Sequence, residues 1–367
     1  MDDNELIAVL RLQNIPNIGD VSAKKLIAHC GSPAAVFADK REHLMKIDGI
    51  GSYTLRGLYD AQHHEAAEAE LVYIRENNIA FTYFEDADHP KLLKHCTDSP
   101  TLLFKRGNID LEGKKIISVV GTRKITSYGM AFCEKFIADI APLNPIIVSG
   151  FAYGVDITVQ KLAVKHGLQT IGCLAHGLNQ MYPKVHAKYI KDVEKNGGFF
   201  TEFWSTSQPE REHFLKRNRI IAGMSEATVV VESAEKGGSL VTADIANSYN
   251  RDVFAVPGRT ADRYSVGCNN LIKQQKAHMM TSAADLVYLL NWDIPEKKTP
   301  TVQKKLFVEL DATEQSIYDY LQKNGKQQLD RIALECQLPI FKASSTLLNM
   351  EMKGVVRPLP GKLFEAI

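Results

Sequence analysis

The sequence predicts an α/β protein in which a doubly wound parallel sheet is flanked by a helical N-terminal module and a winged-helix domain. Three observations predict it: glycine hairpins before helices in residues 1–70, alternating β-branched runs and amphipathic stretches in residues 71–295, and three helical stretches with a hairpin-like ending in residues 307–367. We expect these three segments to be domains, the central one with an N-terminal extension and the last one following a linker at 296–306.

Composition sets the broad class. The 367 residues are 45% hydrophobic and 24% charged, as in an ordinary globular protein of two or three domains. No apolar run approaches the roughly 20 residues that span a bilayer, and the start, Met1–Glu5, is acidic where a signal peptide is basic. The six cysteines form no Cys-x-x-Cys pair and the histidines no metal-ligand spacing, so we expect a cytoplasmic protein without metal or cofactor. With a net charge of +1, any nucleic-acid-binding surface must be a local cluster of cations.

The N-terminal module contains two similar hairpins. Ile15–Gly19 and Ile47–Gly51 each place an apolar-x-Gly turn before residues with helical apolar spacing. They resemble the helix-hairpin-helix motif of SAM-like modules, in which backbone N–H groups point at a DNA phosphate. Basic and acidic residues nearly balance over residues 1–60. A helical packing module without DNA contact therefore stays an equal alternative.

The central segment carries the strands of the predicted sheet. We expect strands at Lys115–Val120, Pro145–Ser149, Gln169–Leu174, Ala227–Glu232 and Val253–Val256, with helices around Met130–Ile140 and Ser239–Tyr249 between them. Several of the strand runs lack polar alternation, which is typical of parallel strands covered on both faces. In such a sheet ligands bind where the strands end.

The last segment has the outline of a winged helix. Its helices are expected at Thr313–Lys323, Leu329–Cys336 and Phe341–Met352, before a hairpin at Gly354–Phe364. The third helix carries few basic residues and is expected to display Leu347, Leu348, Met350 and Met352. Because a helix that reads DNA bases normally presents Arg, Lys, Asn or Gln, a packing or protein-contact role is favoured over a duplex-binding regulator.

Two glycine turns follow predicted strands. Gly121-Thr122-Arg123 precedes a helix, so its hydroxyl and N–H groups can cradle an anion while the Arg123 guanidinium clamps a phosphate. The stretch Ser149–Asp156 allows close backbone approach through its glycines, although Asp156 equally suits a plain helix cap. Neither a Walker A sequence nor a dinucleotide fingerprint accompanies these turns.

Two further loops are expected at the same edge of the sheet. Arg211–Arg219 holds four cations and one anion around Phe214, a combination of phosphate-binding charge and stacking surface suited to single-stranded nucleic acid. A solvated basic helix is the alternative. Gly237-Gly238-Ser239 opens a helix with a nest of N–H groups for an oxyanion. Together the four loops predict a phosphate-lined groove, and no Ser/His/Asp or Cys/His grouping accompanies them.

Several of these motifs occur in the order of a known family. They are Val120–Arg123, Ser149–Asp156, Gly177–Pro183, Phe214–Arg219, Gly237–Ala243 and Ala255–Gly258. The set resembles the DNA-processing protein A family (DprA, also called Smf). The resemblance implies a Rossmann-like domain that forms a homodimer and binds incoming single-stranded DNA during natural transformation. It further implies that the protein protects this strand and helps to load the RecA-type recombinase, without being an enzyme.

The resemblance also assigns residues. Arg123, Lys184, Arg211, Phe214 and Arg217 match the DNA-contacting places of the family, with backbone help around Gly150 and Gly237-Gly238. Leu271-Ile272 falls in the region used for dimer contact, or is plain core. The full set of candidate DNA- and phosphate-binding residues is Gly121, Thr122, Arg123, Ser149, Gly150, Lys184, Arg211, Phe214, Arg217, Asn218, Arg219, Gly237, Gly238 and Ser239.

The chain departs from the family at three places. Val159-Gln160 replaces a frequent Ala-His pair, His186 replaces an Asn after Tyr-Pro, and Asn179 replaces an Asp. These changes put in doubt any chemistry that needs the missing His or Asp. The alternative function is a nucleotide-processing N-glycosidase-like enzyme of a related fold, whose phosphate loop Gly237–Thr242 matches only in part.

Overall fold

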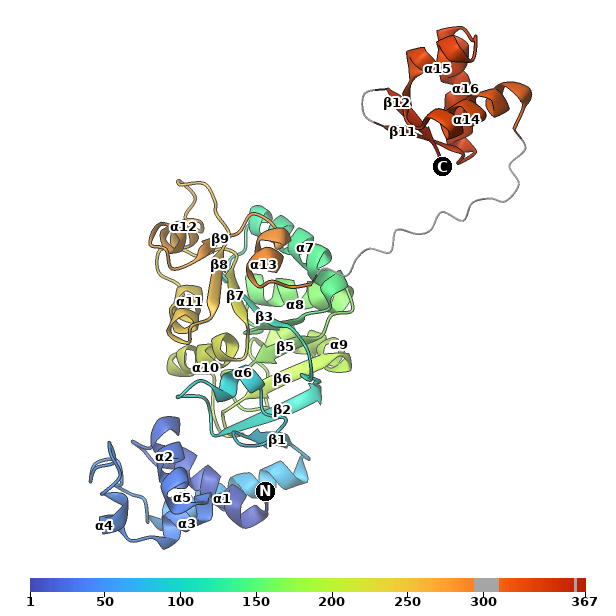
Figure 1. Ribbon diagram of the computed structural model, residues 1–367. Coiled ribbons are helices and arrows are strands. Elements are labelled where there is room, and N and C mark those ends of the chain that lie inside the picture. The colour runs from blue at the N-terminus through green and yellow to red at the C-terminus, as the bar shows by residue number, and fades with distance from the viewer. Residues whose placement is uncertain (294–309, 360–361) are drawn as a thin grey trace. The chain divides into compact units, whose positions relative to one another are not determined.

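A nine-stranded mixed sheet organises most of the computed structural model (Figure 1). The strand order is β1-β2-β6-β5-β4-β3-β7-β8-β9. β2 pairs antiparallel with both β1 and β6, and the neighbouring strands in the rest of this order, from β6 through β3 to β9, pair in parallel. The strands are β1 (Ala80–Tyr83), β2 (Leu102–Asn108), β3 (Ile116–Val120), β4 (Ile146–Ser149), β5 (Thr170–Cys173), β6 (Gly197–Thr201), β7 (Ala227–Val230), β8 (Asp252–Ala255) and β9 (His278–Met279). The doubly wound, mostly parallel sheet predicted from the sequence is confirmed.

The structure describes residues 1–293, 310–359 and 362–367, and the chain divides into two units, Met1–Pro295 and Glu296–Ile367. The expected linker at 296–306 and the beginning of the last expected domain lie outside the described residues. No helix among the described residues combines the length and the apolar character that a bilayer crossing requires.

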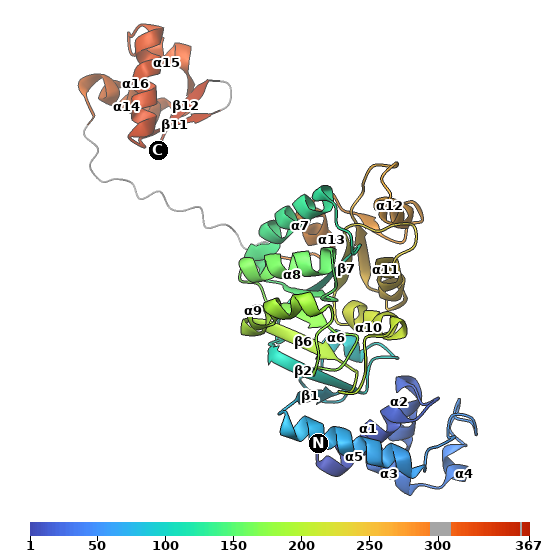
Figure 2. The same cartoon turned by 180° about the vertical axis from the view of Figure 1, so that it is seen from behind.

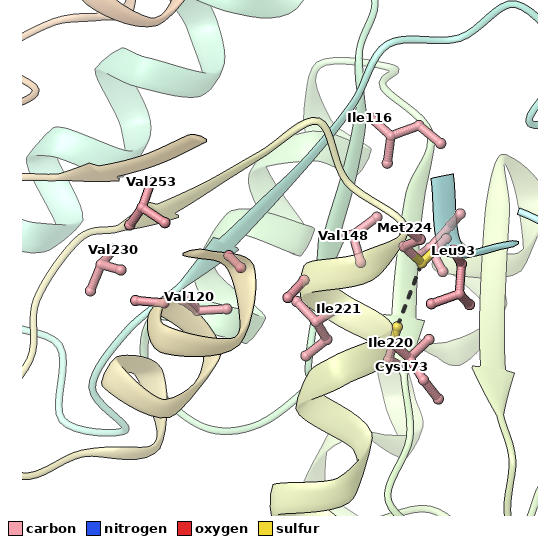
Figure 3. Packing of buried hydrophobic residues seen from close by; sticks show 14 of the residues in the cluster. Leu93, Ile116, Val120, Val148, Cys173, Ile220, Ile221, Met224, Val230 and Val253 are labelled. Atoms are coloured by element: carbon pink, nitrogen blue, oxygen red, sulfur yellow. Dashed lines mark hydrogen bonds between the residues drawn. The ribbon is translucent and has the colours of Figure 1, made fainter. Parts of the chain in front are cut away.

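Helices cover both faces of the sheet. One face is packed by α7 (Ser127–Ile140), α8 (Val155–Lys165) and α13 (Ala283–Leu289), and the other by α6 (Lys91–Lys94), α10 (Arg211–Gly223), α11 (Gly238–Ser248) and α12 (Val266–Lys273). Along β3, Ile117 and Val119 face the first layer while Ile116 and Val120 face the second, as the period of two in a strand requires. Figure 3 shows part of the hydrophobic core between the sheet and this second helix layer, where Val120 lies near Ile221 of α10.

The five strands expected from the sequence are β3, β4, β5, β7 and β8, while β1, β2, β6 and β9 were not predicted. The sequence of β6 begins with two glycines, which is untypical of a strand. A Cβ at Gly198 would lie 2.0 Å from the carbonyl oxygen of Arg106 on β2, so this position needs glycine for the two strands to pair.

The N-terminal module comprises α1 (Asp3–Asn14), α2 (Asp20–Cys30), α3 (Pro33–Ala38), α4 (Arg41–Leu44) and α5 (Ala61–Glu76). It lies beside β1 at one end of the sheet, as both views show (Figure 2). The expected boundary at residue 70 falls inside α5, which packs along α1. Gly19 begins α2 as the first hairpin predicts, but the second hairpin is followed by turns at 52–59 rather than by a helix.

The remaining helices of the first unit are short: the 3₁₀ helices η1 (Ala141–Leu143) and η2 (Lys184–Tyr189), and α9 (Ile190–Lys195). The second unit consists of α14 (Ala312–Asn324), α15 (Leu329–Glu335), α16 (Ile340–Met352) and a small sheet in the order β10-β12-β11. Its strands are β10 (Gln327–Gln328), β11 (Val356–Leu359) and β12 (Leu363–Ala366).

The structure of α16 corrects the expectation that four apolar residues are displayed on its surface. Leu347 and Met350 are fully buried in the core of the second unit, whereas Leu348 and Met352 are exposed. Lys353, at the end of this helix, forms an ion pair with Glu314. Half of the apolar side chains expected on the helix surface are therefore core residues.

Candidate nucleic-acid interface

A groove of about 610 Å³ lies at the C-terminal ends of β3, β4 and β7. β4 and β7 pair with β3 on opposite sides, so the chain leaves β3 toward one edge of the sheet and leaves β7 toward the other. The switch point of the sheet therefore lies between β3 and β7, and this is where doubly wound proteins bind ligands. Ten of the fourteen candidate residues line this groove: Gly121, Thr122, Arg123, Arg211, Phe214, Arg217, Asn218, Gly237, Gly238 and Ser239. The structure thus brings together candidate residues from three separate segments of the chain, 121–123, 211–218 and 237–239.

Backbone hydrogen bonds hold the loop after β3 in place. Thr122 donates its N–H to the carbonyl oxygen of Glu232 at 2.7 Å and accepts a hydrogen bond from the Val155 N–H at 3.1 Å. Gly154, with φ of +76°, comes so close that a Cβ there would lie 2.1 Å from the Thr122 carbonyl oxygen. This rigid support leaves the Arg123 side chain exposed, with its guanidinium 5.2 Å from the centre of the Phe214 ring.

The loop after β7 forms the opposite wall. Gly237 precedes the first turn of α11, and no side chain among the described residues caps this helix start. The first N–H groups of a helix lack partners within the helix, so those of α11 can bind an anion. The Ser239 hydroxyl donates to Ser233 at 3.0 Å, which holds the turn, and a Cβ at Gly238 would meet open space. Lys236 is exposed at the same wall. It was not among the candidates, although it stands in the loop that the sequence singled out.

The α10 helix contributes the remaining groove residues. Arg211 is exposed at its first turn and Phe214 is half-buried one turn later. Arg217 is buried and donates from Nη1 to the carbonyl oxygens of Gly150, at 2.7 Å, and Cys173. This guanidinium therefore belongs to the wall and base of the groove, beneath the exposed cations.

Asp156 lies beside that guanidinium at the bottom of the groove. It is buried in the first turn of α8, and its carboxylate accepts a long hydrogen bond, 3.4 Å, from the Ala152 N–H. Burial raises the pKa of the Asp156 carboxyl, and the charge of Arg217 opposes this rise. The carboxylate thus bonds back to the loop after β4. It does not cap α8 as the alternative proposed, since the N-cap is Gly154 and no described side chain caps this helix start.

Four candidate residues do not line the groove. Arg219 is the clearest correction: it is buried, donates to the carbonyl oxygen of Asp98, and forms ion pairs with Asp20 of α2 and Glu202. Its charge joins α10 to the N-terminal module, so it is not available to a phosphate. Ser149 is also structural, because its buried hydroxyl donates to the Val119 carbonyl oxygen at 2.6 Å.

The other two lie close to the groove. The carbonyl oxygen of Gly150 accepts a hydrogen bond from Arg217, so Gly150 supports the groove wall and does not line the groove. Lys184 is exposed on η2, two residues after Tyr182, whose ring centre is 5.7 Å from that of Phe214. Sequence reasoning missed Tyr182, which stands in the quoted Gly177–Pro183 motif, because only the fold reveals its contact with Phe214.

The two residues expected at a dimer contact, Leu271 and Ile272, differ in burial. Leu271 is buried in the core between α12 and the sheet, whereas Ile272 is half-buried at the rim of a hollow beside the edge strand β9. Within the described ranges, no group of three or more His, Cys, Asp or Glu side chains is arranged to hold a metal ion.

The fold and the groove define a class: a Rossmann-like α/β protein with a groove lined by cations and glycine turns at the switch point of its sheet. The particular family follows from comparison with known proteins. The chain belongs to the DNA recombination-mediator protein A family, whose model matches residues 80–291, and residues 305–362 match the DprA winged helix domain. The resemblance inferred from the sequence motifs is confirmed, and the family places the protein in DNA processing and recombination.

Individual relatives support this assignment. The DNA processing protein DprA of Bacillus subtilis is 37% identical over 218 residues, which cover 59% of this chain and 73% of the relative. Protein Smf of Escherichia coli is 29% identical over 302 residues, or 81% of this chain and 80% of the relative.

Two solved structures are similar as well. That of DprA from Streptococcus pneumoniae has a TM-score of 0.67 at 27% identity, covering 78% of this chain and 98% of the other. The structure of DNA processing protein A from Helicobacter pylori, described for its single-stranded DNA binding mode, has a TM-score of 0.52 at 26% identity, covering 57% and 95%.

Proposed function

We propose that the groove binds single-stranded DNA, with phosphates on its cations and a base against Phe214. The observation that carries the proposal is the excess of cations in a groove that is also lined by one aromatic ring. Four cations and one carboxylate line the groove, in a chain whose net charge is only +1. The cations are Arg123, Arg211, Arg217 and Lys236, and the carboxylate is Asp156.

The aromatic ring favours a single strand over a duplex. A base can stack on Phe214 only when it is unpaired, and such stacking contributes about 1–3 kcal/mol per base. The N–H groups at the start of α11 supply a second, uncharged phosphate site on the facing wall. The single-stranded DNA binding mode described for the Helicobacter pylori relative agrees with this proposal.

We further propose that the protein acts in the cytoplasm as a homodimer that protects incoming single strands during natural transformation and helps to load a RecA-type recombinase. Its six free cysteines are compatible with a reducing compartment. The region of α12 around Ile272, next to the edge strand β9, is the proposed dimer contact. The proposed role is binding rather than turnover.

The test is a titration of single-stranded and duplex oligonucleotides of the same sequence, with the oligomeric state measured in the same buffer. We expect micromolar or tighter binding of the single strand and weaker binding of the duplex. Equal or tighter duplex binding would contradict the proposal. Release of free base from nucleoside monophosphates would instead support the N-glycosidase alternative.

A further inference from the structure

We propose that a bound strand continues from the groove onto an adjoining surface that consists of three tyrosines and two lysines. This surface, here termed the aromatic extension, comprises Tyr153, Tyr182, Tyr189, Lys161 and Lys188. It would bind the next bases and phosphates of the same single strand, so the proposal rests on the proposed function and deepens it.

The aromatic extension begins at the groove itself. The ring of Tyr182 meets that of Phe214 edge to face, with centres 5.7 Å apart and planes inclined by 62°. Tyr182 is 41% exposed and Tyr153 is 45% exposed, which leaves much of each ring open to a ligand. A base that leaves Phe214 therefore meets a second aromatic surface directly beside it.

A second group of rings lies around His186. His186, four residues after Tyr182, has its ring centre 5.1 Å from that of Tyr153 and 6.2 Å from that of Tyr189. Its Nδ1 lies 2.9 Å from the carbonyl oxygen of Phe151, which fixes the imidazole between the two tyrosines. The rings of the aromatic extension thus come from the loop after β4 and from the segment between β5 and α9.

Cations accompany these rings. The ammonium groups of Lys161 and Lys188 lie 5.3 and 5.1 Å from the centre of the Tyr189 ring. Neither lysine forms an ion pair with a carboxylate in the part of the chain that the structure describes. Both lysines thus lie beside the half-buried ring of Tyr189, which His186 connects to the ring of Tyr153. Cations without carboxylate partners beside aromatic rings suit a polyanion with flat bases.

The Tyr182 ring is not needed to hold its own loop. The main-chain N–H of Tyr182 donates to Nε2 of the buried His176 at 3.1 Å, and the Gln180 side chain donates to the Ser207 carbonyl oxygen at 2.8 Å. These bonds remain when the ring is removed, so substitutions of Tyr182 test ligand binding rather than folding.

The experiment measures the affinity for oligothymidylates of graded length, from about 4 to about 20 nucleotides, the range of known single-strand site sizes. The variants are Tyr182→Ala with Tyr153→Ala, and Tyr182→Phe with Tyr153→Phe. The control is Tyr288→Ala, since Tyr288 is 87% exposed on α13. We expect the double alanine variant to bind the shortest oligomers like the wild type and to lose about 5-fold or more on the longer ones. The phenylalanine variant and the control should bind all lengths like the wild type.

The outcomes separate the two proposals. If the wild type binds no single strand, the proposed function fails. If the wild type binds but the alanine variant keeps wild-type affinity at every length, or loses it equally at every length, the aromatic extension is wrong while the groove stands. Photo-crosslinking with 5-iodouracil placed at successive positions gives an independent readout, in which Tyr182 and then Tyr153 should react at positions progressively farther from the base on Phe214.

Discussion

The guanidinium of Arg217 donates a 2.7 Å hydrogen bond to the carbonyl oxygen of Gly150, which ties α10 to the loop after β4. Arg123, on the loop after β3, is exposed, and its guanidinium forms no hydrogen bond or ion pair with the residues that the structure describes. Both guanidinium groups lie near the Phe214 ring, at 5.9 and 5.2 Å. Two arginines of one groove thus have different roles, one in supporting its wall and the other in reaching a ligand.

This difference predicts separate effects on stability. Arg217→Ala removes the donor to two buried carbonyl oxygens, so the free energy of unfolding should fall by about 3 kcal/mol or more. Arg123→Ala should change it by less than about 0.5 kcal/mol, as for an ordinary surface substitution. Urea denaturation measures both values, and equal losses would contradict the assignment.

The ion pairs of Arg219 predict a structural effect without a direct effect on DNA. Glu202 is 2% exposed and Asp20 is 11% exposed, so Arg219→Met leaves a half-buried carboxylate without this ion pair and a buried one with only Lys216 at its rim. The free energy of unfolding should fall by about 3–5 kcal/mol. Arg75→Ala, which breaks the exposed pair with Asp3, serves as the control and should cost about 1 kcal/mol or less. Under conditions where the Arg219 variant is folded, a large loss of DNA affinity would show that this side chain does reach the ligand.

Two glycines with similar φ angles give a test of the support under the loop after β3. Gly154 and Gly167 have φ of +76° and +72°, but only at Gly154 would a Cβ collide with another atom, the Thr122 carbonyl oxygen. Gly167→Ala should cost roughly 1–2 kcal/mol, the ordinary penalty for a left-handed residue. Gly154→Ala should cost more and should also weaken DNA binding, because Thr122 and Arg123 must move. Thermal unfolding and a binding titration on both variants check this, and equal effects would count against it.

A buried histidine predicts acid sensitivity. His89 is 2% exposed, neither ring nitrogen has a hydrogen-bond partner within the described residues, and burial lowers its pKa to about 4. The unfolded chain, with a histidine pKa near 6.5, takes up a proton first as the pH falls. Stability should therefore drop by about 3 kcal/mol between pH 6.5 and pH 4 on account of this residue.

Comparison of variants isolates this effect from other titrations. His89→Phe keeps a ring that cannot be protonated, so its free energy of unfolding should fall less steeply below pH 6.5 than that of the wild type. Parallel curves for the wild type and His89→Phe would contradict the prediction.

The sequence predicted the central strands because parallel strands buried on both faces are continuous apolar runs, as in Ile116–Val120. It did not predict β6, where close pairing with β2 requires glycine at Gly198, or the two-residue strand β9. The sequence pattern also did not indicate that α5 runs through the expected boundary at residue 70, because its packing along α1 depends on contacts between distant segments. Hydrophobic pattern along the sequence predicts strands that are buried on both faces, but it does not predict elements that depend on pairing between distant segments.

The same limit applies to the groove. The glycine turns and Arg123 were predicted because their chemistry is local in the sequence. Arg211 and Arg219 are equivalent as cations of one basic segment, and only the position of Asp20, 199 residues away from Arg219, separates their roles. Lys236 and Tyr182 stood in quoted motifs but were not selected, since their places beside the groove follow from the fold.

The dependence of single-strand affinity on salt, measured for the wild type and Arg123→Ala, tests the groove most directly. Each phosphate contact releases counterions and adds about 0.7 to the magnitude of the slope of log affinity against log salt concentration. We expect Arg123→Ala to bind more weakly and to lose about 0.7 of that slope, with Arg75→Ala unchanged. An Arg123→Ala variant with wild-type affinity and wild-type slope would contradict a phosphate-binding groove at the ends of β3 and β7.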